Sequence, residues 1–413
     1  MSLAANQEAW GFESFMQRNL EKDLLRFTTA GSVDDGKSTL IGRLLHDSKS
    51  VFEDQMAAVK KSRINRSTGA VDFSLLTDGL RAEREQGITI DVAYRYFSTP
   101  KRKFILADTP GHVQYTRNMA TGASTADLAI ILVDAKRGLT DQSRRHASIA
   151  ALLGIRHFVI AVNKMDLIKF DYGVFDDVFR NFKPFLDSLR IVEPYFLPMS
   201  ALLGDNVVER SANMPWFVGA PLLEHLESIE VEKPVDAPFR MAVQRAVRPD
   251  QTFRGYAGQI ASGVIRPGDE VLALPSGRRS RVKRIVTYDG DLEIAHAPLS
   301  VTLTLEDEID ISRGDMLSAG AEPQNSRSLE ATVVWFDETP LDPSKEYLLK
   351  HTTQTIRAKV ETDSVLKMND IGEVRITLAQ PLFFDAYKSN RTTGSFILMD
   401  RESNATAAAG MIK

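Results

Sequence analysis

Hydrophobic runs of strand length alternate with helical patterns through the first half of the chain. The runs Leu24–Ala30 and Asp127–Val133 are rich in β-forming residues and predict buried strands, whereas Gln142–Leu153 carries hydrophobic residues at helical spacing. Strands that alternate with helices form a doubly wound, mostly parallel sheet. We therefore predict an α/β domain over residues 1–231.

The remaining elements of this domain follow from the same patterns. A hairpin is expected from two short runs separated by a turn, Val92–Phe97 and Lys103–Ala107. The other predicted strands are His157–Val162 and Tyr195–Pro198, and the other predicted helices are 12–22, 172–190 with an interruption near Pro184, and Leu222–Ile229.

The helical pattern ends at a stretch rich in proline and charge, Val231–Pro238, which is typical of an interdomain linker. Beyond it, short β-type runs alternate with turns such as Arg266–Asp269, as in small closed barrels. A polar break at Glu322–Ser328 divides this region. We predict one β-barrel over residues 239–325 and a second over residues 328–413.

The composition is that of a soluble globular protein, with 43% hydrophobic and 26% charged residues. A net charge of −4 gives no overall attraction to nucleic acid or to an anionic membrane, although a local patch could suffice for RNA. Cysteine is absent, which excludes disulfides and thiolate metal sites. No apolar run reaches membrane-spanning length, so we expect a cytoplasmic protein without membrane or nucleic-acid partners.

A phosphate-binding motif, Gly-x-x-x-x-Gly-Lys-Ser, occupies residues 31–38 between a predicted strand and a predicted helix. Its two glycines let the loop wrap tightly, so that backbone N–H groups and the positive end of the helix face phosphate oxygens. Lys37 places a charge between the outer two phosphates, and Ser38 offers a hydroxyl to Mg²⁺. The motif predicts a nucleoside triphosphate but leaves the base open.

A second motif, Asp108-Thr-Pro-Gly111-His112, follows the predicted strand that ends at Ala107. A carboxylate at this strand end can accept a hydrogen bond from Mg²⁺-bound water, and Gly111 can donate its N–H to a γ-phosphate. His112 is then placed to orient the attacking water. Its alternative role is a half-exposed histidine at a helix start, but the preceding Asp-x-x-Gly favours catalysis.

The base is specified by Asn163-Lys-Met-Asp166 and by Ser200-Ala-Leu, each at the end of a predicted strand. Asp166 can accept both N1–H and N2–H₂ of guanine, a pairing that adenine cannot match. Asn163 can tie this loop to the phosphate loop, and the stem of Lys164 can cover the purine face. These motifs together predict a guanine nucleotide site.

A threonine between the first two motifs, Thr89 in Gly87–Ile90, could complete the Mg²⁺ shell when GTP is bound. Its alternative role is simply to enter a strand. Val33 and Ile88 could form an apolar gate in front of His112. The polar stretch 47–87 is typical of a moving lid.

The complete candidate site falls into three sets. Catalytic roles are assigned to His112, Lys37, Thr89 and Gly111, and metal-ligand roles to Ser38, Thr89 and Asp108. We expect GTP or GDP to contact Gly31, Ser32, Val33, Asp34, Asp35, Gly36, Lys37, Ser38, Thr39, Asp108, Thr109, Pro110, Gly111, His112, Asn163, Lys164, Met165, Asp166, Ser200, Ala201 and Leu202.

In these motifs, and in Gly255–Asp269 of the first predicted barrel, the chain resembles the translation-factor class of GTPases. More narrowly, Ser32–Lys49, Glu83–Arg95 and Gly111–Met119 resemble the large, GTPase subunit of bacterial sulfate adenylyltransferase (ATP sulfurylase). This resemblance implies a heteromeric enzyme. A separate small catalytic subunit would make adenylylsulfate and pyrophosphate from ATP and sulfate, while this chain hydrolyses GTP to drive that reaction.

Departures from elongation factors count against a ribosomal role. Ser32 stands where those proteins usually carry histidine, Asp35 where they usually carry histidine or serine, and Gln86 where they usually carry arginine. The alternatives are nonetheless an elongation-factor-like GTPase that carries a charged tRNA, and a GTP-dependent switch without an enzyme partner. Some sulfurylase relatives add an adenylylsulfate kinase domain; no second phosphate loop occurs here, and Ser403–Gly410 predicts a loose tail or the start of a linker.

Three other features are expected to be structural. Arg279, Arg281 and Lys283 share one strand face and could meet a phosphate backbone, but a solvated sheet face is favoured. Trp216–Val218 could bind a partner, although a core or interdomain contact is favoured. The acidic residues between Glu306 and Asp310 are expected to form a solvated run without metal.

Overall fold

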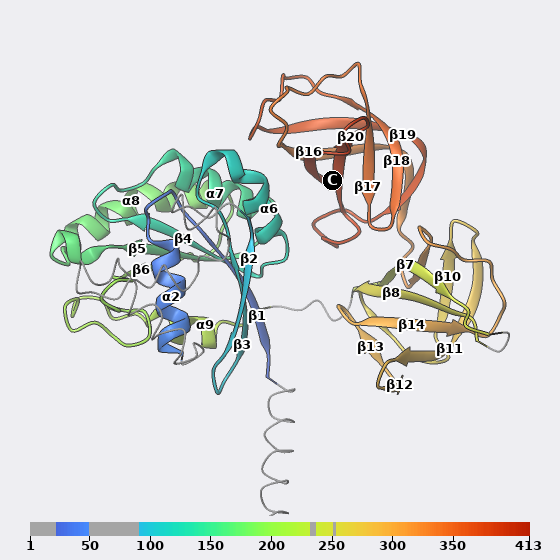
Figure 1. Ribbon diagram of the computed structural model, residues 1–413, viewed down its shortest axis with the longest axis horizontal. Coiled ribbons are helices and arrows are strands. Elements are labelled where there is room, and N and C mark those ends of the chain that lie inside the picture. Colours follow the sequence, from blue (N-terminus) through green and yellow to red (C-terminus); the bar gives the residue numbers. More distant parts are fainter. Residues whose placement is uncertain (1–21, 49–90, 232–236, 251–252) are drawn as a thin grey trace, which may run out of the picture. The chain divides into compact units, whose positions relative to one another are not determined.

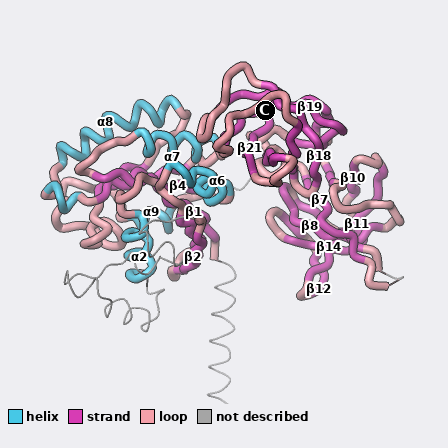
Figure 2. The backbone as a smooth tube through the Cα atoms, turned by 45° about the horizontal axis from the view of Figure 1, so that its top comes forward, coloured by secondary structure: helices cyan, strands magenta, loops and turns pink. Residues whose placement is uncertain are grey.

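The computed structural model describes residues 22–48, 91–231, 237–250 and 253–413. They fall into two compact units, one within residues 1–231 and one within 232–413 (Figure 1). In the part of the chain that is described, the helices belong mainly to the first unit and the second is built from strands (Figure 2). The finer division into domains 1–231, 239–325 and 328–413 stays a prediction.

The first unit is a six-stranded sheet covered by helices. The strand order is β2-β3-β1-β4-β5-β6, with β2 antiparallel to β3 and all other neighbours parallel. The strands are β1 (Leu24–Ala30), β2 (Ala93–Ser98), β3 (Lys103–Asp108), β4 (Leu128–Asp134), β5 (His157–Asn163) and β6 (Tyr195–Pro198). The helices are α2 (Lys37–Asp47), α6 (Thr116–Ser124), α7 (Asp141–Leu152), α8 (Tyr172–Ser188) and α9 (Leu222–Ser228).

Burial of hydrophobic side chains explains this arrangement. All seven residues of β4 are buried, as expected for a central parallel strand with helices on both faces. On one face, α2 and α9 contribute to the same core cluster as β1 and β3. Figure 1 shows α6, α7 and α8 on the opposite face. The predicted doubly wound α/β fold and its edge hairpin, β2–β3, are confirmed.

The second unit contains two antiparallel β-barrels, as predicted. In the first, the order β10-β15-β7-β8-β14-β11 closes through a pairing of β10 with β11. Its strands are β7 (Phe239–Val247), β8 (Gly255–Ser262), β10 (Glu270–Leu274), β11 (Arg278–Thr287), β14 (Ser300–Leu305) and β15 (Met316–Ala319), accompanied by the short strands β9 (Val264–Ile265), β12 (Gly290–Leu292) and β13 (Ala295–His296). The second barrel closes in the order β16-β19-β18-β17-β20-β21. Its strands are β16 (Gln324–Trp335), β17 (Glu346–His351), β18 (Gln354–Glu361), β19 (Ile371–Phe384), β20 (Ser395–Asp400) and β21 (Thr406–Ile412).

The prediction of a loose tail at Ser403–Gly410 is wrong, because β21 closes the second barrel between β16 and β20. Alanine and glycine are depleted in strands, so the run does not look like one. In β21, a neighbouring aromatic side chain leaves room only for a small residue. A Cβ atom on Gly410 would lie 2.1 Å from Cζ of Phe396, so the aromatic ring occupies the space above the glycine.

Replacing Gly410 with valine is therefore expected to destabilise the barrel by about 1–3 kcal/mol, because an overpacked core displaces side chains and backbone. Denaturant unfolding monitored by circular dichroism measures this loss. Ala409→Val is the matched control: Ala409 is half-buried and its side chain points to the other face of the strand. Equal stability of the two variants would contradict this account of the strand.

The predicted interruption near Pro184 is also wrong, since α8 runs unbroken from Tyr172 to Ser188. Proline removes one backbone N–H and usually breaks a helix interior. Pro184 lies on the exposed side of α8, where water can hydrogen-bond to the carbonyl that loses its partner. The buried stripe of Val178, Phe182 and Leu186 holds the helix on both sides of the proline.

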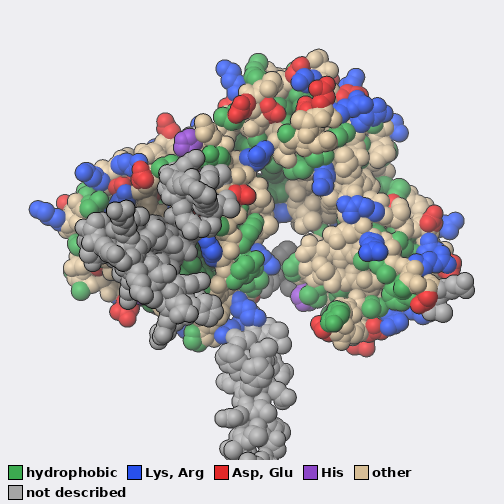
Figure 3. Space-filling view, in the orientation of Figure 1, with side chains coloured by type: hydrophobic (Ala, Val, Ile, Leu, Met, Phe, Trp, Pro, Cys, Tyr) green, Lys and Arg blue, Asp and Glu red, His purple; other side chains and the backbone are tan. Residues whose placement is uncertain are grey.

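Two of the features expected to be structural have the contacts that this role requires. Arg279 is exposed on β11 and forms ion pairs with Glu270 and Glu322. Figure 3 shows basic and acidic side chains interspersed over the β-barrels in the same way. Trp216 packs on Tyr172 and Phe175 of α8, within the first unit.

Candidate nucleotide-binding site

Four loops meet at one edge of the parallel sheet, because the carboxyl ends of neighbouring parallel strands lie together. Residues 31–36 follow β1, 109–112 follow β3, 135–140 follow β4 and 164–166 follow β5. This is the edge at which ligands bind in open α/β sheets. The predicted phosphate and base motifs are therefore brought to one place.

The phosphate loop has the left-handed backbone that its sequence implies. Gly36 has φ 94° and Asp34 has φ 68°. A Cβ atom on Gly36 would lie 2.4 Å from Nδ2 of Asn163, so the base loop approaches too closely for any other residue. Gly36 caps α2 without a side-chain hydrogen bond, and the first-turn N–H groups of this helix face the loop as an anion site requires.

Lys37 is buried at the centre of the loop. Its Nζ lies 2.9 Å from the carbonyl oxygens of both Gly31 and Ser32. Burial lowers the pKa of Lys37, while the carboxylates of Asp35 and Asp108 act to raise it. The two carbonyl oxygens hold the ammonium group of Lys37 in place. Its positive charge can then balance the negative charge of phosphate oxygens bound in the loop.

The second motif lies directly beside this lysine. Asp108, the last residue of β3, is 2% exposed and pairs across the sheet with Thr29. The hydroxyl of Thr109 donates a 2.5 Å hydrogen bond to the Thr29 carbonyl and fixes the loop. A Cβ atom on Gly111 would lie 2.6 Å from the backbone carbonyl oxygen of Gly31, so only glycine allows the two loops to approach this closely.

His112 follows this glycine and is half-buried. The backbone N–H of Gln114 donates to its Nδ1 at 3.3 Å, so the neutral imidazole carries its proton on Nε2. The ring lies 5.9 Å from that of Tyr115. His112 is therefore oriented by its neighbours, as a positioned catalytic side chain must be; its catalytic role stays a proposal.

The base motifs are tied to the phosphate loop by Asn163. Its Nδ2 donates to the Asp35 carbonyl at 2.8 Å, and its Oδ1 accepts from the N–H of Ala201 at 2.9 Å. The hydroxyl of Ser200 donates to Oδ1 of Asp166 at 2.6 Å and fixes that carboxylate. One side chain thus joins three of the predicted motifs.

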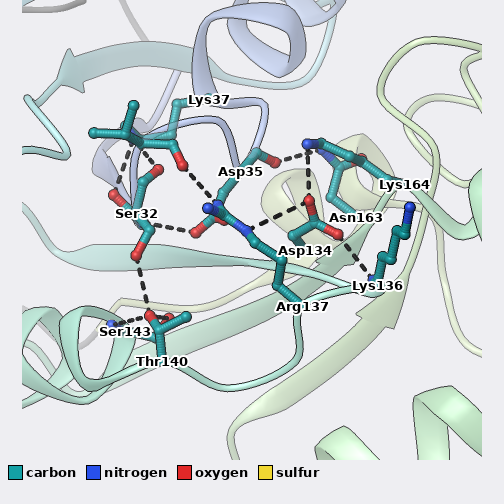
Figure 4. A network of polar contacts seen from close by, with 12 residues as sticks. Ser32, Asp35, Lys37, Asp134, Lys136, Arg137, Thr140, Ser143, Asn163 and Lys164 are labelled. Carbon is teal, nitrogen blue, oxygen red and sulfur yellow. Dashed lines mark hydrogen bonds and ion pairs between the residues drawn. The ribbon is translucent and has the colours of Figure 1, made fainter.

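Sequence reasoning missed the stretch from the end of β4 to the first turn of α7, which supplies four polar side chains: Asp134, Arg137, Thr140 and Gln142. Figure 4 shows how the first three enter a network with the phosphate and base loops. Oδ2 of Asp134 lies 2.8 Å from Nζ of Lys164, and the hydroxyl of Thr140 lies 3.0 Å from that of Ser32. The only signal in the sequence was position, since Asp134 directly follows the predicted strand Asp127–Val133 and ends β4 in the structure.

Gln142 contacts the second motif from the first turn of α7. Its Nε2 lies 3.4 Å from the Gly111 carbonyl and 2.8 Å from Nε2 of His146. Burial lowers the pKa of His146 to about 3, so this imidazole stays neutral and can accept the hydrogen bond. The peptide that carries His112 is therefore contacted by a buried pair on α7.

Thr89, Ile88, the motif 87–90 and most of the predicted lid lie outside the described residues. Ser38, in the first turn of α2, and Asp108, at the end of β3, supply the hydroxyl and carboxylate oxygens that Mg²⁺ prefers. The described residues contain no group of three or more histidine, aspartate or glutamate side chains suited to a metal. A magnesium ion here would depend on the nucleotide phosphates, as is usual for such sites.

The fold and the pocket define a phosphate-loop GTPase domain. Residues 22–240 match the model of the elongation factor Tu GTP-binding domain, and residues 361–413 match that of the GTP-eEF1A C-terminal domain-like family. Guanine nucleotide binding follows from this membership.

Comparison of the whole chain with individual proteins identifies a narrower family. The chain is 53% identical to sulfate adenylyltransferase subunit 1 of Tolumonas auensis, over 97% of this chain and 89% of that protein. It is 52% identical to the bifunctional enzyme CysN/CysC of Rhodopirellula baltica, over 100% of this chain and 67% of that protein. It is 54% identical to the bifunctional enzyme NodQ of Rhizobium sp., over 97% of this chain and 65% of that protein. The chain belongs to the family of sulfate adenylyltransferase subunit 1. Among the described residues, no helix is long and apolar enough to cross a membrane.

Proposed function

We propose that this chain binds GTP with Mg²⁺ and hydrolyses it as the GTPase subunit of a heteromeric sulfate adenylyltransferase. The observation that carries the nucleotide assignment is Asn163, whose side chain links the phosphate loop to Ala201 of the base loop. The sulfate assignment is supported by near-full-length relatives that carry this name.

In the proposed complex, each motif has a separate task. Amide groups of the phosphate loop and the ammonium group of Lys37 hold the phosphates, while Asp166 recognises the guanine edge. Ser38, Asp108 and Thr89 would hold Mg²⁺, which neutralises charge on the phosphate oxygens. The N–H of Gly111 meets the γ-phosphate, and His112 orients the attacking water through its Nε2–H.

The partner is a small catalytic subunit that handles ATP and sulfate. It transfers the adenylyl group of ATP to sulfate, which forms adenylylsulfate and releases pyrophosphate. Because that transfer is unfavourable, the free energy of GTP hydrolysis on this chain offsets it. We place the heterodimer in the cytoplasm.

Stimulation of GTP turnover tests this proposal. The chain, purified with a small nucleotidyltransferase subunit, is expected to hydrolyse GTP faster when ATP and sulfate are both present than when either is omitted. Adenylylsulfate should accumulate only while GTP is available. Stimulation by ribosomes and charged tRNA, without stimulation by ATP and sulfate, would contradict the proposal and favour the elongation-factor alternative.

A further inference from the structure

Arg137, in the loop between β4 and α7, contacts the phosphate loop through its guanidinium group. Its Nη2 donates to the Val33 carbonyl at 2.6 Å and forms an ion pair with Oδ1 of Asp35. Its Nε lies 3.7 Å from Oδ2 of Asp134. The guanidinium group thus joins a loop carbonyl and two carboxylates, and no motif used above includes it (Figure 4).

Asp35 is an unusual residue for this place. Its side chain is 2% exposed, and it directly precedes Gly36 and Lys37 in a loop built to hold anions. Burial raises the pKa of Asp35, whereas the hydrogen bond from Arg137 and the charge of Lys37 lower it. An ionised carboxylate here repels a triphosphate unless a cation balances it.

The Asp35 carboxylate also shapes the loop. Its Oδ2 accepts a hydrogen bond from the N–H of Ser32 at 2.6 Å. The backbone carbonyl of Asp35 accepts another from Nδ2 of Asn163 at 2.8 Å. Asp35 therefore stabilises the shape of the loop through its hydrogen bonds, but its negative charge opposes the binding of phosphate. A cation paired with Asp35 keeps these hydrogen bonds and balances the negative charge.

We infer that Arg137 is a positioning residue for nucleotide binding, which neutralises Asp35 and holds the phosphate loop in the shape that accepts a triphosphate. This rests on the proposed GTP-binding function and adds a residue to it. Arg137 acts through Asp35 and the Val33 carbonyl, not through a contact with the phosphates. Its partner Asp134 is shared with Lys164 of the base motif, so the same guanidinium connects the two halves of the pocket.

A charge-removal pair tests this inference by calorimetry of GTP binding to the full chain. Arg137→Ala is expected to weaken GTP binding roughly tenfold, because it leaves a buried carboxylate uncompensated. Asp35→Asn in the same background should restore most of the affinity, because the amide keeps an acceptor for the Ser32 N–H without the charge. Arg137→Lys retains the cation and should stay within about threefold of the wild type.

Lys136→Ala is the matched control, since Lys136 is the adjacent exposed cation and contributes only its backbone N–H to the network. It should bind GTP as the wild type does. A double variant as weak as Arg137→Ala would overturn the inference, because Arg137 would then act on the phosphates directly. If the double variant binds GTP more weakly than Arg137→Ala does, the inference is also overturned, because the network would then have only a structural role. Failure of the wild-type chain to bind GTP would instead overturn the proposed function.

Discussion

His112→Ala is expected to slow single-turnover GTP hydrolysis by about 10²–10⁴-fold, the usual contribution of a positioned side chain that handles a proton or water. The affinity for GTP should change by less than about threefold, since His112 acts in the transition state and not in ground-state binding. The physical basis is the imidazole orientation: the Gln114 N–H occupies Nδ1, which leaves the Nε2 proton for the attacking water.

Rapid-mixing measurement of phosphate release, together with a fluorescent-nucleotide titration, separates these two quantities. His157→Ala is the matched control, because His157 is a half-buried histidine at the amino end of β5, at the opposite edge of the sheet from the pocket. Normal hydrolysis by His112→Ala would remove this histidine from the mechanism. A parallel loss of affinity would assign it to binding.

Asp166→Asn is expected to reverse base preference. An amide presents a donor where the carboxylate had an acceptor, so it no longer matches guanine N1–H and N2–H₂, but it does match xanthine, which has a carbonyl at C2. Sites built on such hydrogen bonds reject the mismatched analogue by about 10⁴–10⁵-fold, and a reversal approaching that size is expected here. The Ser200 hydroxyl, 2.6 Å from Oδ1 of Asp166, should still orient the substituted side chain.

Competition between GTP and xanthosine triphosphate measures this change. Asp171→Asn provides the control: it makes the same substitution at the N-cap of α8, where the side chain only accepts from the Gly173 N–H. Asparagine caps a helix as well as aspartate does, so neither stability nor base preference should move. An unchanged preference for GTP in Asp166→Asn would place the base pocket elsewhere.

The fold and the pocket's outline could be predicted because both depend on local patterns. Parallel strands with buried faces read as continuous hydrophobic runs, and the motifs at Gly31, Asp108 and Asn163 each directly follow such a run. Since the carboxyl ends of parallel strands meet at one edge of a sheet, the proximity of these motifs follows from the strand pattern alone. The two barrels were visible from turn spacing and short alternating runs.

What escaped prediction depends on contacts between residues distant in sequence. Arg137 meets Asp35 across 102 residues, and nothing in the sequence around either residue indicates the pair. The strand β21 contains three alanines and a glycine, and the Phe396 ring packs directly against the glycine, Gly410. Pro184 is expected to interrupt a helix, but α8 continues through it because the proline lies on the exposed side. For β21 and α8, tertiary packing outweighed the local signal.

The two hydrogen bonds of Asn163 have a thermodynamic consequence. Because one amide side chain braces Asp35 on the phosphate side and Ala201 on the base side, ordering either loop removes conformational freedom from the other. Guanosine alone, or triphosphate alone, must therefore order both loops although it makes contacts with only one of them. The intact nucleotide meets that entropic cost once, so its affinity should exceed the product of the affinities of its two halves.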